Sequence, residues 1–288
     1  MGAGTRAQLR QYNIRLKKHL GQNFLFDKNI LARLADAAEL TDTDTVLEIG
    51  PGSGNFTVQL AQRAGTVIAV EVDQQLEPLL TANLAPFSNI HLVWGDFLQL
   101  SWNQLWQIAA TSSGATRRKV AANLPYHITS PVLVKLLTEM PKPDLAVLLM
   151  QMEVAQRLVA SPGTKEYGSL SVLTQFYCYP ELVLKVPPTV FFPRPKVWST
   201  AVRLRFRSQP AVLVDDEQFF RQVVRASFRH RRKTLVNSLL YGLNAPITRD
   251  CVAAVLENAN IDPARRGETL DLEEFGQLTK ALVDHLGL

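Results

Sequence analysis

Three glycines at two-residue spacing mark the most informative segment of the chain, which reads Glu48-Ile-Gly-Pro-Gly-Ser-Gly54. An apolar run precedes this segment and an amphipathic run follows it, so we predict a loop between a strand and a helix. Gly50, Gly52 and Gly54 let the backbone approach a ligand where a β-carbon would collide. A dinucleotide-binding loop would want a third glycine at position 55, which is Asn55 here. The loop therefore favours S-adenosylmethionine, which carries adenosine and an amino acid but no pyrophosphate.

Acidic residues end the next two apolar runs, where the adenosine half of such a cofactor would lie. Glu71 follows the loop by about twenty residues, a distance at which a carboxylate can accept hydrogen bonds from both ribose hydroxyls. Asp96 can accept a hydrogen bond from the adenine amino group, and Phe97 can line the pocket of the ring. Each feature alone is often a turn or a helix cap. The glycine loop and two acids at consecutive strand ends together indicate a cofactor site.

The fourth apolar run leads into Asn123-Leu-Pro-Tyr126, a segment suited to an amino nitrogen as the methyl acceptor. The lone pair of adenine N6 is delocalised into the ring, and acceptors for both N6 hydrogens return electron density to the nitrogen. The Asn123 side-chain carbonyl and the Leu124 backbone carbonyl can accept them, while Pro125 fixes the turn. The ring of Tyr126 can stack on the adenine. Because the methylated nitrogen can lose its proton to water, the chemistry depends on positioning and electrostatics.

These residues must be held together at one edge of a sheet, and the hydropathy pattern predicts such a sheet. Apolar strands that alternate with amphipathic helices are typical of a parallel sheet with helices on both faces. The predicted strands are Thr45–Ile49, Val67–Val72, His91–Trp94, Lys119–Ala122 and Leu145–Met150. The predicted helices are Ile30–Ala38, Phe56–Ala64, Gln75–Leu84 and Val132–Glu139. We therefore predict an α/β protein with a Rossmann-like methyltransferase sheet.

Two later strands and a helical end complete the predicted organisation. Glu181–Val186 and Ser199–Phe206 flank the proline-rich segment Pro187–Pro195 and suit an antiparallel edge on the mostly parallel sheet. Helical spacing then covers Asp216–Phe228, Lys233–Tyr241, Asp250–Asn258 and Glu273–Leu286. We predict a catalytic domain over residues 1–208 and a small all-helical C-terminal domain over residues 209–288.

The chain is basic, with a net charge of +5 and a pI of about 9.3, which points to a polyanion such as nucleic acid. A mildly basic enzyme without such a partner is the alternative. The densest basic cluster comprises Arg225, Arg229, His230, Arg231, Arg232 and Lys233. On one helix, Arg225, Arg229 and Arg232 would share a face that neutralises phosphates, although a solvated helix face is also common for such a charge run.

A second basic stretch covers residues 10–19 and precedes Asn23, so it can either gate the cofactor pocket or touch RNA. The two cysteines, Cys178 and Cys251, lie far apart and form no metal-binding motif. The five histidines are scattered, so we expect no metal. No apolar run is long enough to span a membrane, and the N-terminus lacks a secretory signal, so we expect a cytoplasmic protein.

The motifs together resemble the small-subunit ribosomal RNA adenine N6,N6-dimethyltransferases, the KsgA/Dim family. The resemblance extends from about residue 15 into the helical domain. It is carried by Lys18-His-Leu-Gly-Gln-Asn-Phe-Leu25, Glu48-Ile-Gly-Pro-Gly52, Asn123-Leu-Pro-Tyr126, Tyr167-Gly-Ser-Leu-Ser-Val172, Val186-Pro-Pro188 with the segment from Phe191 to Val197, and Arg231-Arg-Lys-Thr-Leu235.

The resemblance implies a substrate and a set of contacts. The substrate would be two adjacent adenosines in the hairpin loop near the 3′ end of small-subunit (16S) rRNA, within an assembling small subunit. The implied cofactor contacts are Asn23, Leu25, Gly50, Glu71, Asp96 and Asn123. Phe191, or the adjacent Phe192, would sandwich the flipped adenine against Tyr126. The enzyme would be a monomer that uses S-adenosylmethionine.

Two positions depart from the family pattern. His127 follows Tyr126 where bacterial members more often carry asparagine, and we expect it to tune rather than abolish activity. Trp198 follows Lys196 and Val197 and is also unusual, and its place near the proline-rich loop predicts an influence on RNA contact.

Three alternatives use the same residues differently. An adenine methyltransferase of DNA would have a proline where this chain has Leu124, and a large-subunit rRNA enzyme would usually lack the proline-rich arrangement after Val186. A non-catalytic assembly or transcription factor would have lost acidic or aromatic residues, yet Glu71, Asp96 and Tyr126 are all present. The intact residues favour an enzyme.

Overall fold

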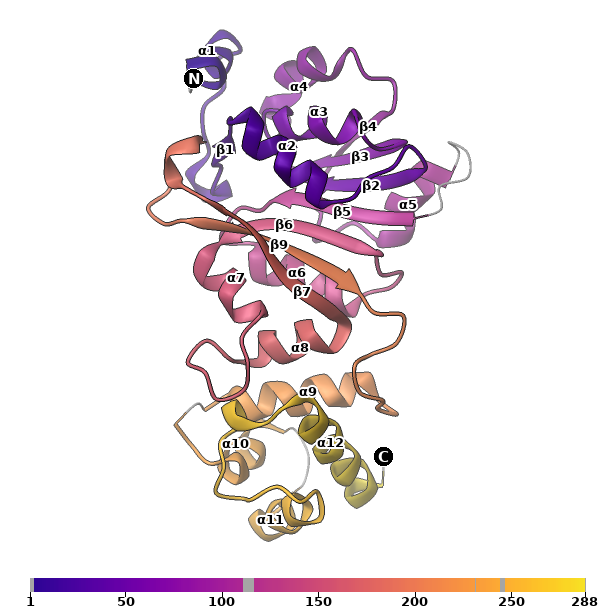
Figure 1. The fold of residues 1–288 in the computed structure, drawn as a ribbon, viewed down its shortest axis with the longest axis vertical. Coiled ribbons are helices and arrows are strands. Elements are labelled where there is room, and N and C mark those ends of the chain that lie inside the picture. The colour runs from indigo at the N-terminus through magenta and orange to yellow at the C-terminus, as the bar shows by residue number, and fades with distance from the viewer. Residues whose placement is uncertain (1–2, 111–116, 231, 244–246, 288) are drawn as a thin grey trace. The chain divides into compact units, whose positions relative to one another are not determined.

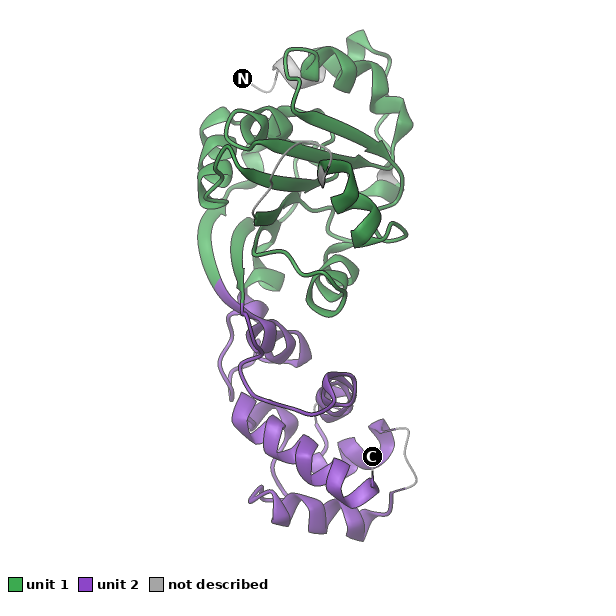
Figure 2. Cartoon of the chain, turned by 90° about the vertical axis from the view of Figure 1, so that its right-hand side faces the viewer, with its two compact units in different colours: residues 1–155, 181–206 green, residues 156–180, 207–288 purple. Residues whose placement is uncertain are grey.

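The computed structural model of the protein describes residues 3–110, 117–230, 232–243 and 247–287. The chain divides into two compact units, each built from two stretches of sequence (Figure 2). Unit 1 comprises Met1–Ala155 and Glu181–Phe206, and unit 2 comprises Gln156–Pro180 and Arg207–Leu288. Residues 156–180 thus group with the C-terminal helices, whereas the sequence pattern alone places one boundary at residue 208.

A seven-stranded sheet with the strand order β4-β3-β2-β5-β6-β9-β7 forms the centre of unit 1 (Figure 1). The strands from β4 to β6 in this order are parallel, and β9 runs antiparallel to β6. The predicted Rossmann-like α/β fold is therefore confirmed, including its antiparallel addition. The bounds are β2 Asp44–Ile49, β3 Thr66–Glu71, β4 Ile90–Trp94, β5 Arg117–Asn123, β6 Leu145–Gln151, β7 Cys178–Val186 and β9 Ser199–Phe206.

The strand order reverses direction between β2 and β5, and this reversal determines where a ligand can bind. Strands β3 and β4 continue to one side of β2, whereas β5 and β6 continue to the other. In such sheets the crevice at the carboxyl ends of the strands beside the reversal is the usual ligand site. The glycine loop that follows β2 and Asn123 at the end of β5 flank this crevice.

Helices follow most of the parallel strands. The four predicted helices are present, and α1, α5 and α7 are additional helices that the sequence pattern did not predict. The bounds are α1 Ala3–Gln11, α2 Lys28–Ala37, α3 Asn55–Ala61, α4 Glu77–Leu84, α5 Trp102–Ala110, α6 Thr129–Thr138 and α7 Met152–Leu158. Short 3-10 turns lie at Lys18–Leu20, Gln74–Leu76 and Pro188–Val190.

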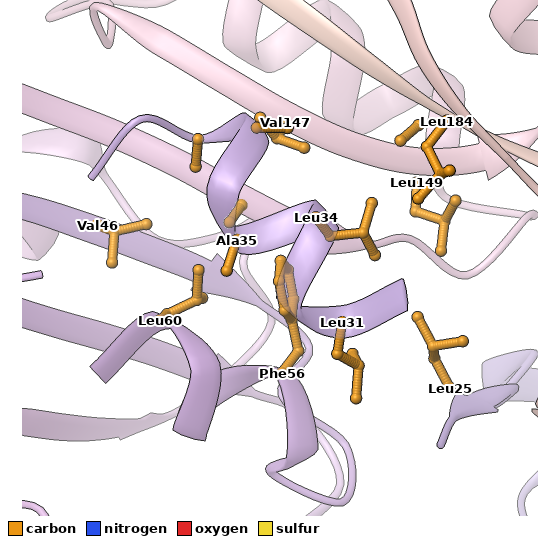
Figure 3. Packing of buried hydrophobic residues seen from close by; sticks show 14 of the residues in the cluster. Leu25, Leu31, Leu34, Ala35, Val46, Phe56, Leu60, Val147, Leu149 and Leu184 are labelled. Atoms are coloured by element: carbon orange, nitrogen blue, oxygen red, sulfur yellow. The ribbon is translucent and has the colours of Figure 1, made fainter. Parts of the chain in front are cut away.

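The apolar faces of α2 and α3 pack on one face of the sheet. Asp27 caps the N-terminus of α2, because its carboxylate accepts hydrogen bonds from the backbone N–H groups of Asn29 and Ile30. Figure 3 shows the packed side chains, which include Leu31, Leu34, Phe56 and Leu60 from the helices and Val46, Val147 and Leu149 from the strands. Each such side chain contributes about 1.5–3 kcal/mol when fully buried, so this face holds β2 and β6 rigidly beneath the site.

The N-terminal residues 17–25, which we call the strap, are fixed to the sheet domain by a short pairing. Strand β1 (Phe24–Leu25) pairs antiparallel with β8 (Phe191–Phe192), with Leu25 opposite Phe191. Leu25 is buried in the same apolar cluster as α2. The strap and the proline-rich segment, which are far apart in sequence, therefore lie side by side at the site.

Unit 2 is helical. Its bounds are α8 Ser169–Tyr177, α9 Glu217–Phe228, α10 Leu235–Gly242, α11 Arg249–Asn258, a 3-10 turn at Gly267–Thr269 and α12 Leu272–Leu286. The four predicted C-terminal helices are confirmed, while α8 was not predicted. Phe176 of α8 stacks on Phe220 of α9 at a centroid distance of 4.2 Å, and the Tyr167 hydroxyl donates to the Leu270 carbonyl at 2.8 Å. These contacts explain why 156–180 groups with the later helices.

Candidate active site

A cavity of about 190 Å³ lies at the carboxyl ends of β2, β3, β4 and β5 in unit 1. The strap, the glycine loop and the start of the segment after β5 complete its walls. The predicted cofactor residues that line it are Asn23, Leu25, Gly50, Gly52, Glu71, Asp96, Phe97 and Asn123. The structure thus brings together residues that span one hundred positions of sequence.

The glycine loop needs its glycines for two different reasons. Gly50, Gly52 and Gly54 have φ angles of +70°, +58° and +79°, which residues with a β-carbon rarely adopt. A β-carbon on Gly52 would also lie 2.8 Å from the Phe24 ring of the strap. Gly54 does not line the cavity: it precedes α3, and a β-carbon there would lie 3.2 Å from Leu80. Gly54 therefore allows the helix to start and α4 to pack closely.

Glu71 connects the end of β3 to the glycine loop. One carboxylate oxygen accepts hydrogen bonds from the Val72 and Asp73 N–H groups at 2.9 and 2.8 Å, and the other accepts from the Gly52 N–H at 3.0 Å. Burial raises the pKa of Glu71, while the three N–H donors favour its ionised form. The second oxygen retains a lone pair for a ligand, so Glu71 both shapes the loop and faces the cavity.

Glu48 is a cavity residue that the sequence pattern did not assign to the site. Its side chain is 1% exposed, and its Oε2 has no hydrogen-bond partner within the described residues. Burial, with the nearby charge of Glu71, raises its pKa to about 8. A buried acid without a partner is costly unless a ligand completes it. Its position directly before the glycine loop, as the last acid of a buried strand, was the available signal.

Asp96 and Phe97 lie where β4 ends. Asp96 is exposed, and one of its oxygens accepts a hydrogen bond from the Leu98 N–H at 2.9 Å. Phe97 is buried and meets Trp102 edge to face at 5.4 Å. The rim between these residues and Glu71 includes Val72, whose side chain is half exposed. This corner therefore offers one carboxylate oxygen and apolar walls, the combination that a purine ring requires.

The strap is anchored to β3 through one buried acid. Asp73 accepts a hydrogen bond from the Lys17 ammonium at 2.7 Å and another from the Gln22 side chain at 2.8 Å. Burial acts to raise the pKa of Asp73, but these two donors hold it below its usual value. Lys17, one member of the basic N-terminal stretch, therefore anchors the strap through an ion pair to Asp73, two residues beyond Glu71.

Asn123 is oriented by the strap. Its Nδ2 donates to the Asn23 backbone carbonyl at 2.9 Å, and the Asn23 side chain in turn donates to the Gly21 carbonyl. The amide group therefore presents its Oδ1 away from the strap. No donor to this oxygen exists among the residues that the structure describes. The Asn123 Oδ1, the predicted acceptor oxygen, is thus held in a fixed orientation and accepts no hydrogen bond from the described residues.

The backbone after Asn123 provides a second oxygen. The Leu124 N–H donates to Leu149 of β6 at 3.0 Å, which fixes the peptide at the strand end. The Pro125 carbonyl accepts a hydrogen bond from the Ile128 N–H at 3.1 Å, which closes a turn. Within the described ranges nothing donates to the Leu124 carbonyl. Pro125 lines the cavity, whereas the Leu124 side chain is buried in the core.

The two aromatic residues predicted to hold the adenine differ in their surroundings. The Tyr126 hydroxyl hydrogen bonds with the Ser199 hydroxyl of β9 at 2.9 Å, and burial raises its pKa. Its ring is half-buried. Phe191 is 3% exposed and belongs to the apolar cluster of α2, whereas Phe192 is half-buried. Neither Tyr126 nor Phe191 lines the cavity, so their role as a sandwich for adenine stays a prediction.

The basic cluster of unit 2 is not a single helical face. Helix α9 ends at Phe228, and the Arg229 guanidinium donates to the Tyr241 carbonyl at 3.2 Å. The expectation that Arg232 continues the face of Arg225 and Arg229 is therefore wrong, because the chain turns before it. Arg231 lies outside the described residues. Arg225, Arg232 and Lys233 are exposed, and no ion pair within the described residues holds them.

No group of three or more His, Cys, Asp and Glu side chains within the described ranges could hold a metal ion. No helix in the same ranges is both long and apolar enough to cross a membrane.

Comparisons with known proteins place this geometry in a family. The family model described as ribosomal RNA adenine dimethylase matches residues 13–278. A protein named ribosomal RNA small subunit methyltransferase A, from Geobacillus sp. (strain WCH70), is 48% identical over 279 residues, which cover 96% of this chain and 95% of the relative. The protein of the same name from Geobacillus thermodenitrificans is 46% identical over 280 residues, with 97% and 95% coverage.

Solved structures agree with the sequence relatives. A dimethyladenosine transferase from Plasmodium falciparum has a TM-score of 0.76 at 25% identity and covers 92% of this chain and 98% of its own. The 23S rRNA methyltransferase ErmE has a TM-score of 0.65 at 30% identity, with 90% and 99% coverage. The family match spans the strap, the cavity and the helical unit. This chain therefore belongs to the ribosomal RNA adenine dimethylase family.

Proposed function

We propose that this enzyme transfers methyl groups from S-adenosylmethionine to N6 of two adjacent adenosines in the hairpin loop near the 3′ end of small-subunit (16S) rRNA. Each adenosine receives two methyl groups. The enzyme acts as a cytoplasmic monomer on an assembling small subunit during ribosome biogenesis.

Two unpaired oxygens at the end of β5 are the observation that carries the proposal. The Asn123 Oδ1 and the Leu124 carbonyl follow one another in the chain, and neither receives a hydrogen bond from the described residues. The adenine amino group has two hydrogens to donate. A pair of fixed acceptors without donors of their own is complementary to that group, and buried acceptors favour occupation by a donor.

The residues of the site perform positioning and electrostatics. When bound, S-adenosylmethionine supplies a methyl carbon that its sulfonium makes electrophilic. Asn123 and Leu124 accept the N6 hydrogens, return electron density to the nitrogen and direct its lone pair toward the cavity. Tyr126 supports the ring of the base. After transfer the nitrogen carries a positive charge, the two oxygens stabilise it, and its proton passes to water.

The acids of the cavity fit the charge of S-adenosylmethionine. That molecule carries an ammonium group and a sulfonium, and Glu48 offers a buried oxygen that lacks a partner. Glu71 retains a lone pair for the ribose, and Asp96 has a free carboxylate oxygen for the adenine amino group. A buried pair of acids without a cation gains most from a cationic ligand. Gly50 and Gly52 allow that ligand close to the backbone.

The proposed division of labour follows the two parts of the chain. We assign catalysis to residues 1–208 and contact with rRNA or the ribosome to residues 209–288. The exposed cations Arg225, Arg232 and Lys233 support the second assignment, because exposed cations without an ion pair within the described residues suit a phosphate backbone. The relatives named ribosomal RNA small subunit methyltransferase A support the choice of subunit.

The test is a methylation assay with labelled S-adenosylmethionine and three substrates: unmethylated small subunits, large subunits and duplex DNA. We expect label only on small subunits, with dimethylated adenosine at two adjacent positions after digestion and mapping. Label on large subunits would instead match the activity that the name of ErmE states, and label on DNA or on another base would also refute the proposal. A protein that binds the cofactor but labels nothing would be a non-catalytic assembly factor.

A further inference from the structure

We propose that residues 194–198, which we call the RPKVW segment, bind an unpaired rRNA nucleotide beside the target adenosine. Trp198 stacks on its base, and Arg194 and Lys196 contact the neighbouring phosphates. This inference rests on the proposed function and adds a binding site to it.

The RPKVW segment is held next to the acceptor site at both ends. On its N-terminal side, β8 pairs with β1 of the strap. On its C-terminal side, the Trp198 carbonyl accepts a hydrogen bond from the Met152 N–H at 3.0 Å. The next residue, Ser199, hydrogen bonds with the Tyr126 hydroxyl at 2.9 Å. The backbone of Trp198 is therefore one residue away from the contact that positions the proposed adenine-stacking ring.

The side chains of this segment are turned to solvent. Trp198 is 48% exposed and Val197 43% exposed, whereas Trp102 and Trp106 of the same unit are 2% and 5% exposed. Exposing an indole that could be buried forgoes a part of its hydrophobic stabilisation. The exposed indole of Trp198, on a segment whose backbone is fixed at both ends, can therefore stack on a planar group of a ligand.

The charge around the RPKVW segment indicates which planar ligand it can bind. Residues 182–214 contain six basic residues and no acidic one. Three of the six already have partners: Arg203 and Arg205 pair with Glu39, and Arg207 stacks over Tyr179. Arg194 and Lys196, both exposed, have no ion pair or side-chain hydrogen bond within the described residues. Arg194 and Lys196 beside the exposed Trp198 indole suit a ligand that has both a negative charge and a flat ring.

A single-stranded nucleotide meets both requirements. Bases in unpaired RNA stack on aromatic side chains, and their phosphates pair with lysine and arginine. The target adenosine must leave its own stack to reach Asn123, which leaves its neighbours unstacked and available. Since Trp198 is adjacent to the Tyr126 anchor, it is placed for a neighbouring base rather than for the target itself.

Steady-state methylation of unmethylated small subunits tests the stacking. For Trp198→Ala we expect KM for the subunit to rise about tenfold, which corresponds to about 1.4 kcal/mol, with unchanged kcat and cofactor affinity. Trp198→Phe keeps a flat ring and should recover most of the affinity. Met140→Ala, which removes another exposed apolar side chain of unit 1, is the matched control and should behave as wild type.

Salt dependence tests the phosphate contacts separately. For Arg194→Ala and Lys196→Ala we expect weaker subunit binding and a slope of log affinity against log salt reduced by about one each. Trp198→Ala should leave the slope unchanged. Lys185→Ala removes an exposed cation of the same acid-free run outside the RPKVW segment, and it should leave both affinity and slope unchanged.

Crosslinking identifies the occupant. With a photoreactive phenylalanine analogue at position 198, we expect a crosslink to rRNA next to the methylated adenosines. A crosslink to a ribosomal protein, or a wild-type KM for Trp198→Ala, would overturn the inference while wild-type methylation upheld the proposed function. If wild type itself did not methylate small subunits, the proposed function would fail, and this inference with it.

Discussion

The two sides of the site are built in opposite ways. The cofactor side is enclosed and acidic: Glu48 and Glu71 are buried, and backbone N–H groups and the strap hold the loop in place. The acceptor side is open and basic: Tyr126 is half-buried, and the RPKVW segment beyond Ser199 is exposed. A small cationic ligand suits the first environment, and a large polyanion suits the second.

This difference shows how one protein can treat two substrates separately. On the cofactor side, Glu71 accepts three backbone hydrogen bonds, and the buried Glu48 oxygen has no partner within the described residues. The acceptor side lacks a substrate donor for Asn123 and Leu124. The strap joins the two sides, because Asp73 anchors it near Glu71 while the Asn23 carbonyl orients Asn123. Substitutions should therefore affect one side without the other unless they loosen the strap.

The largest effect is expected from Asn123→Ala. Loss of the acceptor oxygen should lower kcat by about 10²–10³-fold or more, as for other groups that stabilise developing charge. Cofactor affinity, measured by calorimetry, should largely persist. An equally large fall in cofactor affinity would show that the cofactor side and the acceptor side are not independent. Retained methyl transfer would exclude the proposed role of Asn123.

Asn123→Asp tests whether methyl transfer depends on the orientation of this side chain by the strap. It keeps an acceptor oxygen but removes the donor to the Asn23 carbonyl, so the group is no longer oriented by the strap. We expect kcat between those of wild type and Asn123→Ala. A wild-type rate would show that the orientation by Asn23 is unnecessary.

Glu48→Gln should produce the next largest effect, on the cofactor side only. Replacement of a charged partner by a neutral amide should weaken S-adenosylmethionine binding about 10- to 100-fold, from the roughly 1.5–3 kcal/mol of a hydrogen bond to a charged group. The kcat at saturating cofactor and the affinity for small subunits should change little. A larger change in subunit affinity would mean that the two sides are not independent.

The pH dependence of cofactor binding follows from the same residue. With a pKa of about 8, Glu48 is mostly protonated at neutral pH when no cation lies beside it. A cationic ligand favours the carboxylate, so binding releases a proton, and affinity should rise as pH increases toward 8 and then level off. Glu48→Gln should lose this slope. The amino group of the ligand titrates equally in both proteins, so the difference between the two curves isolates Glu48.

Charge reversal in unit 2 should affect RNA alone. Arg225→Glu with Arg232→Glu should weaken small-subunit binding about tenfold and flatten its salt dependence, because each removes a phosphate contact. Cofactor affinity should stay at the wild-type value. A fall in cofactor affinity would show that the basic cluster is structural. Arg229 is the less clean test, since it holds the Tyr241 carbonyl.

The smallest effect is expected from the Tyr126–Ser199 contact. Tyr126→Phe and Ser199→Ala each remove one hydrogen bond while the ring remains, so kcat should fall about two- to five-fold, in line with roughly 0.5–1 kcal/mol. The double variant should be no worse than either single one. An additive loss would mean that the two hydroxyls act separately.

Local patterns predicted much of this molecule because they report on the nearest neighbours in the chain. Hydropathy placed seven strands of the sheet, and the glycine loop, Glu71, Asp96 and the segment from Asn123 to Tyr126 indicated the chemistry. The patterns missed α1, α5, α7 and α8, and they wrongly extended the helical face of Arg225 to Arg232. Turns and helix ends depend on contacts that spacing does not contain.

Tertiary structure decided how those residues work. The Asn23 carbonyl that orients Asn123 lies one hundred residues earlier, and the Ser199 hydroxyl on Tyr126 lies 73 residues later. Glu48 became a site residue only when the fold buried its oxygen without a partner. The sequence by itself determined which chemical groups are available and at which strand ends. The packing of distant segments determined which of their lone pairs and donors remain free, because a hydrogen bond consumes a group wherever in the chain its partner originates.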